Sequence, residues 1–302
     1  MTQLNWKVIF YLLSATVLWA GNAIAGRLLL ASISPAFLST IRWVLAVLIL
    51  LPFGWQVLKR GSDLWQHRKR FLLLGLFGVG SYNTLMYLAL ETSTPINVTL
   101  IGASMPIWVL LIGALFFQTR PRFLQLLGAL ISIIGVAIVI SRGDWSAFFA
   151  FEWVIGDLFM VLASIGWGTY SWMLSKPGIS NERSWPWAHF LFAQVLIGSL
   201  WTIAFTAIEW NMGNIHIELN WLTVILVLFI VIGPSLIAYR LWGLGVIGAG
   251  PTVASFFGNL IPLFTALLST LLLGDPPAPY HGLAFCLIAI GIALSLKEKK
   301  SG

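Results

Sequence analysis

The chain has 302 residues, of which 59% are hydrophobic and only 9% are charged, and its formal net charge is +7. Soluble domains carry about 25% charged residues, so this composition excludes a water-soluble protein and requires lipid as most of the solvent. The single cysteine, Cys286, excludes an internal disulfide framework, and the basic residues lie between apolar runs, which indicates membrane topology rather than nucleic-acid binding.

Apolar runs of about twenty residues recur along the whole chain, and each is long enough to cross a hydrocarbon core about 30 Å thick. The first run, which ends near Ala23-Ile24-Ala25, resembles a signal peptide, but its length favours a retained helix. The sequence therefore predicts an all-α integral membrane protein with ten transmembrane helices, at 6–27, 35–58, 70–90, 95–117, 122–141, 152–175, 184–208, 219–242, 249–273 and 278–296.

The basic residues predict the orientation of these spans. If the N-terminus is cytoplasmic, fourteen Lys and Arg residues fall on the inner side and three, Arg27, Arg42 and Arg142, fall on the outer side. Because cytoplasmic loops carry the excess of Lys and Arg, we expect both termini to be cytoplasmic.

Two stretches, 81–141 and 237–297, read as copies of each other at an offset of 156 residues. Proline and glycine set backbone shape, so their shared register indicates an internal duplication. Each half has five spans, an odd number, so the second half must be inverted relative to the first. We expect two inverted five-helix repeats, 1–145 and 146–302, around a central cavity. The matched residues are Pro95 with Pro251, Gly102 with Gly258, Pro106 with Pro262, Pro121 with Pro277 and Gly135 with Gly291.

Helix interruptions also come in matched pairs. Gly78 and Gly80 interrupt one span, Pro234 falls in the corresponding turn of the second half, and Pro106 and Pro262 lie near mid-depth of their spans. A proline inside a helix frees a backbone carbonyl, which in hydrocarbon must face protein or water. These five residues are the predicted hinges, and kinks that serve packing alone are the alternative.

Polar and aromatic residues lie on the same interrupted spans, whereas 122–141 and 278–296 are almost entirely aliphatic. Because an exposed amide is costly in lipid, we expect the polar faces to line the cavity. For any one residue, a helix–helix hydrogen bond is the alternative role. The predicted lining is Trp19, Asn22, Tyr82, Asn83, Asn97, Trp108, Trp167, Tyr170, Tyr239, Ser255 and Asn259.

Few charges fall inside the spans. Arg42 lies about two turns into its span, and Glu91 ends another span on the same side, so an ion pair between them is a hypothesis. Asp157 is expected at the interface. No acid falls at mid-depth, so we expect an uncharged, ring-lined cavity, which suits a neutral or zwitterionic solute with an apolar side chain.

Signatures of catalysis and cofactor binding are missing from the sequence. There is no GxxxxGK[ST] or HExxH motif and no cysteine pair, so we expect no catalytic residue, no metal and no cofactor. An integral-membrane lipid enzyme would need acids or histidines together at one interface. A transporter of nucleotide-sugars or phosphorylated metabolites would need two or more cations in the cavity, and the candidates, Arg42 and Arg240, are expected toward the membrane ends.

The ten spans, the five-plus-five duplication, Arg42, the WAGNAIAG turn at 19–26 and the ALETSTPINVTLIGASMP segment at 89–106 resemble the EamA-type branch of the drug/metabolite transporter superfamily. Within it, the chain is similar to the YddG-type amino-acid exporters. The resemblance implies export of amino acids, aromatic ones among them, across the bacterial inner membrane by alternating access, with transport of another solute or a drug as the alternative.

The resemblance also bears on partners and coupling. It implies a small-molecule substrate in a lipid bilayer, no nucleic acid, and a monomer, with a dimer as the alternative. Small multidrug relatives use a glutamate in their first helix, but the span 6–27 has no acid. Their proton-coupled mechanism is therefore not expected here.

Overall fold

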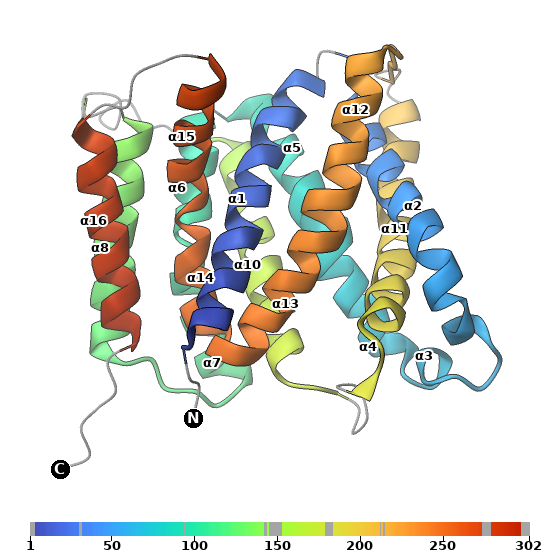
Figure 1. Cartoon of the computed structure of the whole chain (residues 1–302), viewed down its shortest axis with the longest axis horizontal. Helices are drawn as coiled ribbons and strands as arrows, with labels where there is room; N and C mark the ends of the chain where they lie inside the picture. Colours follow the sequence, from blue (N-terminus) through green and yellow to red (C-terminus); the bar gives the residue numbers. More distant parts are fainter. Residues whose placement is uncertain are drawn as a thin grey trace.

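The computed structural model describes residues 4–29, 32–93, 95–141, 144, 153–178, 184–211, 213, 215–273 and 279–296. All regular elements in these ranges are helices, and they stand side by side in one bundle, in which α1 begins and α16 ends at the same end (Figure 1). By length and composition, six of the described helices are long and apolar enough to cross a membrane.

The elements follow one another as α1 (Trp6–Leu29), α2 (Pro35–Gly54), η1 (Trp55–Leu58), α3 (Asp63–Gln66), α4 (Arg68–Gly75), η2 (Leu76–Ser81), α5 (Tyr82–Thr92), α6 (Pro95–Ala103), α7 (Met105–Phe116), α8 (Phe123–Ile140), α10 (Ile155–Ser175), α11 (Trp187–Asn211), α12 (Trp221–Ile230), η4 (Val231–Ile237), α13 (Ala238–Ala249), α14 (Pro251–Gly258), α15 (Ile261–Leu273) and α16 (Pro279–Leu296).

The predicted spans correspond to these helices, but several are broken or shifted. The span expected at 95–117 is two helices, α6 and α7, separated at Ser104, and the span expected at 249–273 is α14 and α15. The span expected to end at residue 242 instead continues through α13 to Ala249. It ends there because the chain turns at Gly250, whose φ of 83° is a conformation that glycine adopts readily.

The irregular parts of the backbone repeat at the offset of the sequence. The π-helical segment η2 spans Leu76–Ser81, and adding 156 to these numbers gives 232–237, which lies within the π-helical segment η4 at Val231–Ile237. Adding 156 to the break at Ser104 gives 260, and α14 and α15 are separated at that point. Short π-helical segments are frequent at functional sites, so these irregularities indicate where a functional site would lie.

Helices from the two halves of the chain pack against each other in antiparallel pairs. A Cβ atom at Gly128 of α8 would lie 2.7 Å from the carbonyl oxygen of Gly291 of α16, and one at Gly291 would lie 2.7 Å from that of Gly128. Further along α8, Gly135 faces the carbonyl of Ala284 at 3.0 Å. Residue numbers therefore rise along α8 as they fall along α16. Since Gly128 corresponds to Ala284 and Gly135 to Gly291, each helix contacts its own counterpart.

The remaining long pairs also join the two halves of the chain. α2 packs on α11, where Thr40 and Thr206 place their hydroxyl oxygens 2.8 Å apart. α1 packs on α13, and α10 packs on α5. One pair of broken helices also joins the halves, because α7 packs directly on α14. Its counterpart at the 156-residue offset is α15 with α6, and no comparable packing joins these two helices in the described part of the chain.

The loops before α2 and before α12 meet at the end of the bundle away from the start of α1. Ile33 and Ile217 form an isolated antiparallel bridge. Close by, the Glu209 carboxylate at the end of α11 accepts hydrogen bonds from the backbone N–H groups of Ala36 at 3.1 Å and Phe37 at 3.0 Å. Glu209 thus caps the N-terminus of α2, where a negative charge is stabilising.

Large apolar side chains cover the outside of the bundle. Trp6 and Trp221 are both 84% exposed, and Leu271 is 80% exposed. Exposed apolar surface of this extent is typical of a protein whose solvent is lipid.

Candidate functional site

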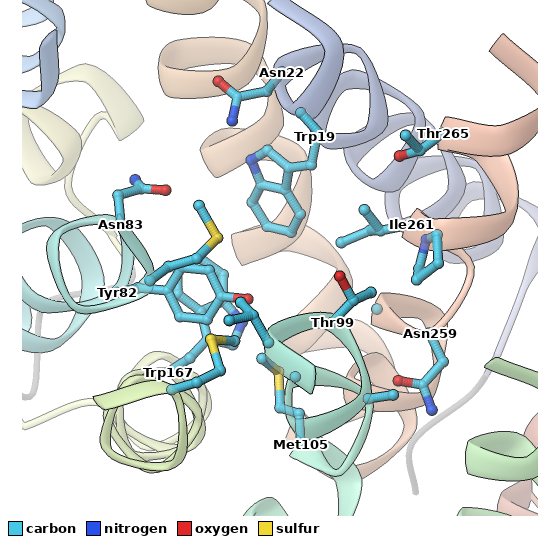
Figure 2. A pocket seen from close by; sticks show the side chains of 18 of the residues that line it. Trp19, Asn22, Tyr82, Asn83, Thr99, Met105, Trp167, Asn259, Ile261 and Thr265 are labelled. Carbon is cyan, nitrogen blue, oxygen red and sulfur yellow. The ribbon is translucent and has the colours of Figure 1, made fainter. Parts of the chain in front are cut away.

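A cavity of about 520 Å³ lies among the helices that carry the breaks and the π-helical segments (Figure 2). One of its wall residues, Trp19, lies 13 residues after Trp6 and 10 before Leu29, which places it about 20 Å and about 15 Å from the two ends of α1. The cavity therefore reaches the middle of the apolar layer.

Aromatic rings form a continuous cluster along the cavity. Trp167 of α10 is its centre, because five other rings lie around it with centroids between 5.1 and 5.9 Å away: Tyr170, Trp19, Tyr82, Tyr239 and Trp242. Most of these pairs meet edge to face or tilted, the arrangements that aromatic quadrupoles favour. The cluster draws on α1, α5, α10 and α13 and so joins both halves of the chain.

Two rings of this cluster donate hydrogen bonds to the π-helical segments. The indole N–H of Trp19 donates to the carbonyl oxygen of Pro234 in η4 at 3.1 Å, and the hydroxyl of Tyr239 donates to that of Gly78 in η2. Gly78 and Pro234 are counterparts at the 156-residue offset. Each half of the chain therefore supplies a cavity ring that satisfies the equivalent carbonyl of the other half.

The broken helices place backbone acceptors at the cavity wall. Pro106 and Pro262 have no N–H to donate to the carbonyls four residues earlier, at Gly102 and Gly258, and both glycines line the cavity. Beside the second break, the Asn259 side-chain N–H₂ donates to the Ser132 hydroxyl at 2.9 Å. This bond points the amide nitrogen toward α8, so the amide oxygen remains as an acceptor.

The cavity is not uncharged, which corrects the prediction. Arg42 lines it and is only 3% exposed. Its Nε–H donates to the Ser235 hydroxyl oxygen, and its Nη1 lies 3.4 Å from the Asn22 amide oxygen. The guanidinium carbon also lies 4.8 Å from the Trp43 ring centroid. Arg42 was expected toward a membrane end and away from the cavity, but the side of α2 on which it projects brings it to the cavity wall.

Seven of the eleven predicted lining residues do line the cavity, namely Trp19, Asn22, Tyr82, Asn83, Trp167, Tyr239 and Asn259, as does the predicted hinge Pro262. The other predicted hinges, Gly78, Gly80, Pro106 and Pro234, are buried within their helices and do not line it. The side chains of Asn97 and Glu91 lie outside the described part of the structure, so the proposed pairing of Arg42 with Glu91 stays a hypothesis.

Three predicted lining residues point elsewhere. Tyr170 lies behind Trp167, and its hydroxyl oxygen accepts a hydrogen bond from the Gln194 amide at 2.9 Å. Trp108 donates its indole N–H to the Ser104 hydroxyl at 3.0 Å. Ser255 donates to a backbone carbonyl of its own helix. The Tyr170 bond joins α10 to α11, which is the alternative role expected for such residues, whereas Trp108 and Ser255 bond to groups four and three residues away along the chain.

Several lining residues carried no signal in the sequence. Three methionines, Met86, Met105 and Met160, line the cavity together with Thr99, Thr265 and Trp242. Apolar residues occur on every face of a membrane helix, so nothing in the sequence distinguishes these methionines from residues that face lipid. Trp242 could have been found, because it lies one turn after Tyr239 on the same face of α13.

The combination of rings, amides, methionines and one guanidinium defines what this cavity binds. Of the described residues on its wall, Arg42 carries the one formal charge. The apolar surface suits a hydrocarbon or aromatic group, and the few polar groups fix orientation, as in most small-molecule sites.

Comparisons with known proteins agree with this reading. The EamA-like transporter family matches residues 6–141 and again 154–297. An uncharacterized transporter of Archaeoglobus fulgidus is 27% identical over 301 residues, which cover 98% of this chain and 99% of that protein. The uncharacterized inner membrane transporter YicL of Salmonella typhimurium is 25% identical over 277 residues, which cover 89% of this chain and 88% of that one.

A solved crystal structure supports the same fold. It superposes with a TM-score of 0.75 and covers 96% of each chain, at 19% identity. At that identity the likeness concerns the fold alone.

Proposed function

Because the chain belongs to the EamA-like transporter family, it is a multi-pass membrane transporter of a small molecule, and we propose that it exports neutral amino acids, aromatic ones among them, or similar small metabolites across the bacterial inner membrane. The observation that carries this proposal is the ring-lined cavity at mid-depth. Its volume of about 520 Å³ falls within the usual range of small-molecule sites, about 300–1,000 Å³. The rings suit an aromatic or aliphatic side chain, and the amides suit its polar end.

The mechanism that we propose is alternating access between two inverted five-helix repeats, 1–145 and 146–302, with ten spans in all. Three observations support it. The family matches the chain twice, at 6–141 and 154–297; the helix irregularities recur at the 156-residue offset; and α8 packs antiparallel against its own counterpart, α16. Inverted repeats of this kind rock against each other around a fixed central site.

The orientation that we propose puts both termini in the cytoplasm. The excess of Lys and Arg on that side supports it, as does the position of the start of α1 and the end of α16 at one end of the bundle (Figure 1). We further propose a monomer as the transporting unit, because each chain has its own cavity.

The main alternative is a phosphorylated or nucleotide-sugar substrate, which would need at least two cations at the site. Arg42 lines the cavity, but Arg240 is not among its lining residues. The Arg240 side chain is exposed, and its guanidinium lies 5.8 Å from the Trp187 ring centroid. A single cation favours a substrate with one carboxylate over one with a phosphate.

Counterflow in proteoliposomes tests the proposal. Vesicles that contain the purified protein and are loaded with unlabelled phenylalanine, tryptophan, threonine or methionine should accumulate the labelled amino acid. Trp167→Ala, which removes the centre of the ring cluster, should lower the rate at least tenfold. Trp221→Ala is the matched control, because Trp221 is 84% exposed at the lipid-facing surface. Absence of counterflow for all four amino acids, with folded protein in the vesicles, would contradict the amino-acid substrate.

A further inference from the structure

Arg42 is an unusual residue because it brings a full charge to a cavity inside the apolar layer. It is 3% exposed, and a buried charge in a membrane span is expensive enough that it is ordinarily retained for function. Packing alone does not explain the choice of arginine, because an apolar residue would fill the same volume between α2 and η4 without the desolvation penalty. The question is therefore what the guanidinium binds.

The contacts of Arg42 hold it in one orientation. The Ser235 hydroxyl donates its own proton to the carbonyl oxygen of Ile230 at 2.8 Å, so its oxygen is left to accept from the Nε–H of Arg42. The Asn22 amide oxygen lies 3.4 Å from Nη1. A guanidinium has five N–H donors in a planar fork, so these contacts fix one part of the group, and a pairing with Glu91 at another edge would not exclude a ligand.

The groups around Arg42 match the rest of an amino acid. Asn22 and Asn83 lie on the same side of the cavity, with Trp19 and Tyr82 beside them, and Asn259 lies on the far side (Figure 2). A carboxylate on Arg42 would place an adjacent ammonium group near the Asn22 amide oxygen, which lies 3.4 Å from Nη1, and Asn83 supplies a second amide to this side of the cavity.

The substrate side chain would then extend across the rings toward the methionines. Met86, Met105 and Met160 all line the cavity. Methionine is flexible and polarizable, so a wall of this kind adapts to apolar groups of different shape.

The charge also decides which solutes are rejected. Of the described lining residues none is acidic, and an amine without a carboxylate has no group that can accept a hydrogen bond from the Arg42 guanidinium. A carboxylate, by contrast, forms charge-assisted hydrogen bonds with a guanidinium fork. The cavity should therefore favour α-amino acids over the corresponding amines.

The geometry points to Arg42 as the carboxylate subsite of the transporter, with Asn22 and Asn83 as acceptors for the substrate ammonium group. This assignment rests on the proposed amino-acid transport and goes beyond it, because it names the group that separates amino acids from cationic solutes of the same shape.

Three ligands that share a phenyl group test the assignment. Phenylalanine has both charged groups, phenethylamine lacks the carboxylate, and 3-phenylpropionate lacks the ammonium group. Each competes with labelled phenylalanine for the purified full-length protein. In the wild type, phenethylamine should bind about 10- to 100-fold more weakly than phenylalanine, which is the loss of affinity expected when a hydrogen bond to a charged group is removed. The affinity of 3-phenylpropionate should fall by a smaller factor.

Three variants complete the test. Arg42→Gln should bring the affinities for phenylalanine and phenethylamine to within about threefold of each other. Arg42→Lys should restore part of the preference for phenylalanine, because lysine keeps the positive charge but lacks the planar fork of N–H donors. Arg240→Gln, the same substitution at an exposed arginine outside the cavity wall, should keep the wild-type ratio.

The outcomes separate the two proposals. A folded Arg42→Gln protein that keeps the wild-type ratio of the affinities for phenylalanine and phenethylamine would overturn the carboxylate subsite and leave amino-acid transport intact. An equal loss of affinity for both ligands keeps that ratio and would overturn the subsite as well. If Arg42→Gln does not fold, a wild-type ratio in Arg42→Lys overturns it equally. A wild-type protein that binds and transports none of the amino acids would overturn the proposed function itself.

Discussion

Tyr239→Phe removes a single oxygen atom from the centre of the molecule and leaves the ring in place. Tyr239 is 4% exposed, and its ring centroid lies 5.1 Å from that of Trp43 and 5.7 Å from that of Trp167. Phenylalanine keeps these contacts. The substitution therefore isolates one interaction between the halves, the hydrogen bond from the Tyr239 hydroxyl to the carbonyl oxygen of Gly78 in η2.

The expected magnitude follows from what the substitution leaves behind. A buried carbonyl that loses its donor costs about 1–3 kcal/mol, while the apolar contact is unchanged, so the free energy of unfolding should fall by that amount. If the bond forms only in the conformation described here, the same free energy shifts the equilibrium between transporter conformations by about 5- to 150-fold.

Two measurements check this reasoning. Thermal unfolding in detergent should show Tyr239→Phe to be less stable than the wild type, and Tyr280→Phe, which removes a hydroxyl outside the ring cluster, serves as the control. Alkylation of Val8→Cys should also be faster in the Tyr239→Phe background, because Val8 is packed against Gly248 where α1 meets α13. The native thiol, Cys286, is exposed, so it is first replaced by serine. Unchanged stability together with an unchanged alkylation rate would refute the argument.

Two further predictions concern the contacts that join the halves. Gly128→Ala would place a Cβ 2.7 Å from the carbonyl oxygen of Gly291 and should destabilise the protein by about 1–3 kcal/mol. The control Gly282→Ala, whose Cβ would have nothing within 4 Å, should be neutral or slightly stabilising. Thermal unfolding of both variants measures the difference, and equal effects would contradict the close contact between α8 and α16. Glu209→Gln weakens the cap of α2 and should lower the free energy of unfolding by about 1 kcal/mol in the same assay. The control Glu218→Gln, at an exposed side chain, should change that free energy by less than about 0.5 kcal/mol. A Glu209→Gln protein as stable as the control would count against the cap.

The sequence predicted the helix breaks well, because proline and glycine act on the backbone locally. Pro106 and Pro262 follow directly on the breaks between α6 and α7 and between α14 and α15. The form of the irregularity at Gly78 and Pro234 was harder to foresee, because a π-helical segment depends on how the extra residue is accommodated by neighbouring helices. The ring of Tyr239 and the indole of Trp19 provide that accommodation from across the chain.

The cavity residues were predicted only where chemistry restricted their choices. An amide such as Asn83 or Asn259 has few favourable places in lipid, and both line the cavity. Trp108 and Tyr170 have the same side-chain types as Trp19 and Tyr239, but Trp108 bonds to Ser104 four residues before it and Tyr170 bonds to Gln194 on α11. Spacing could have indicated the first of these partners but not the second. Arg42 was misplaced because position along a span predicts depth and not the face of the helix.

The unequal packing of the broken helices bears on the alternating access that we propose. α7 and α14 are in contact, whereas no comparable packing joins their counterparts α15 and α6 in the described part of the chain. Thr265 of α15 and Thr99 of α6 both line the cavity (Figure 2). If the two halves are equivalent repeats, as we propose, each arrangement is available to either pair. The interface of α7 with α14 therefore indicates how α15 and α6 would pack against each other in the opposite conformation. If α15 and α6 close while α7 and α14 separate, the bound solute becomes accessible from the other face of the membrane.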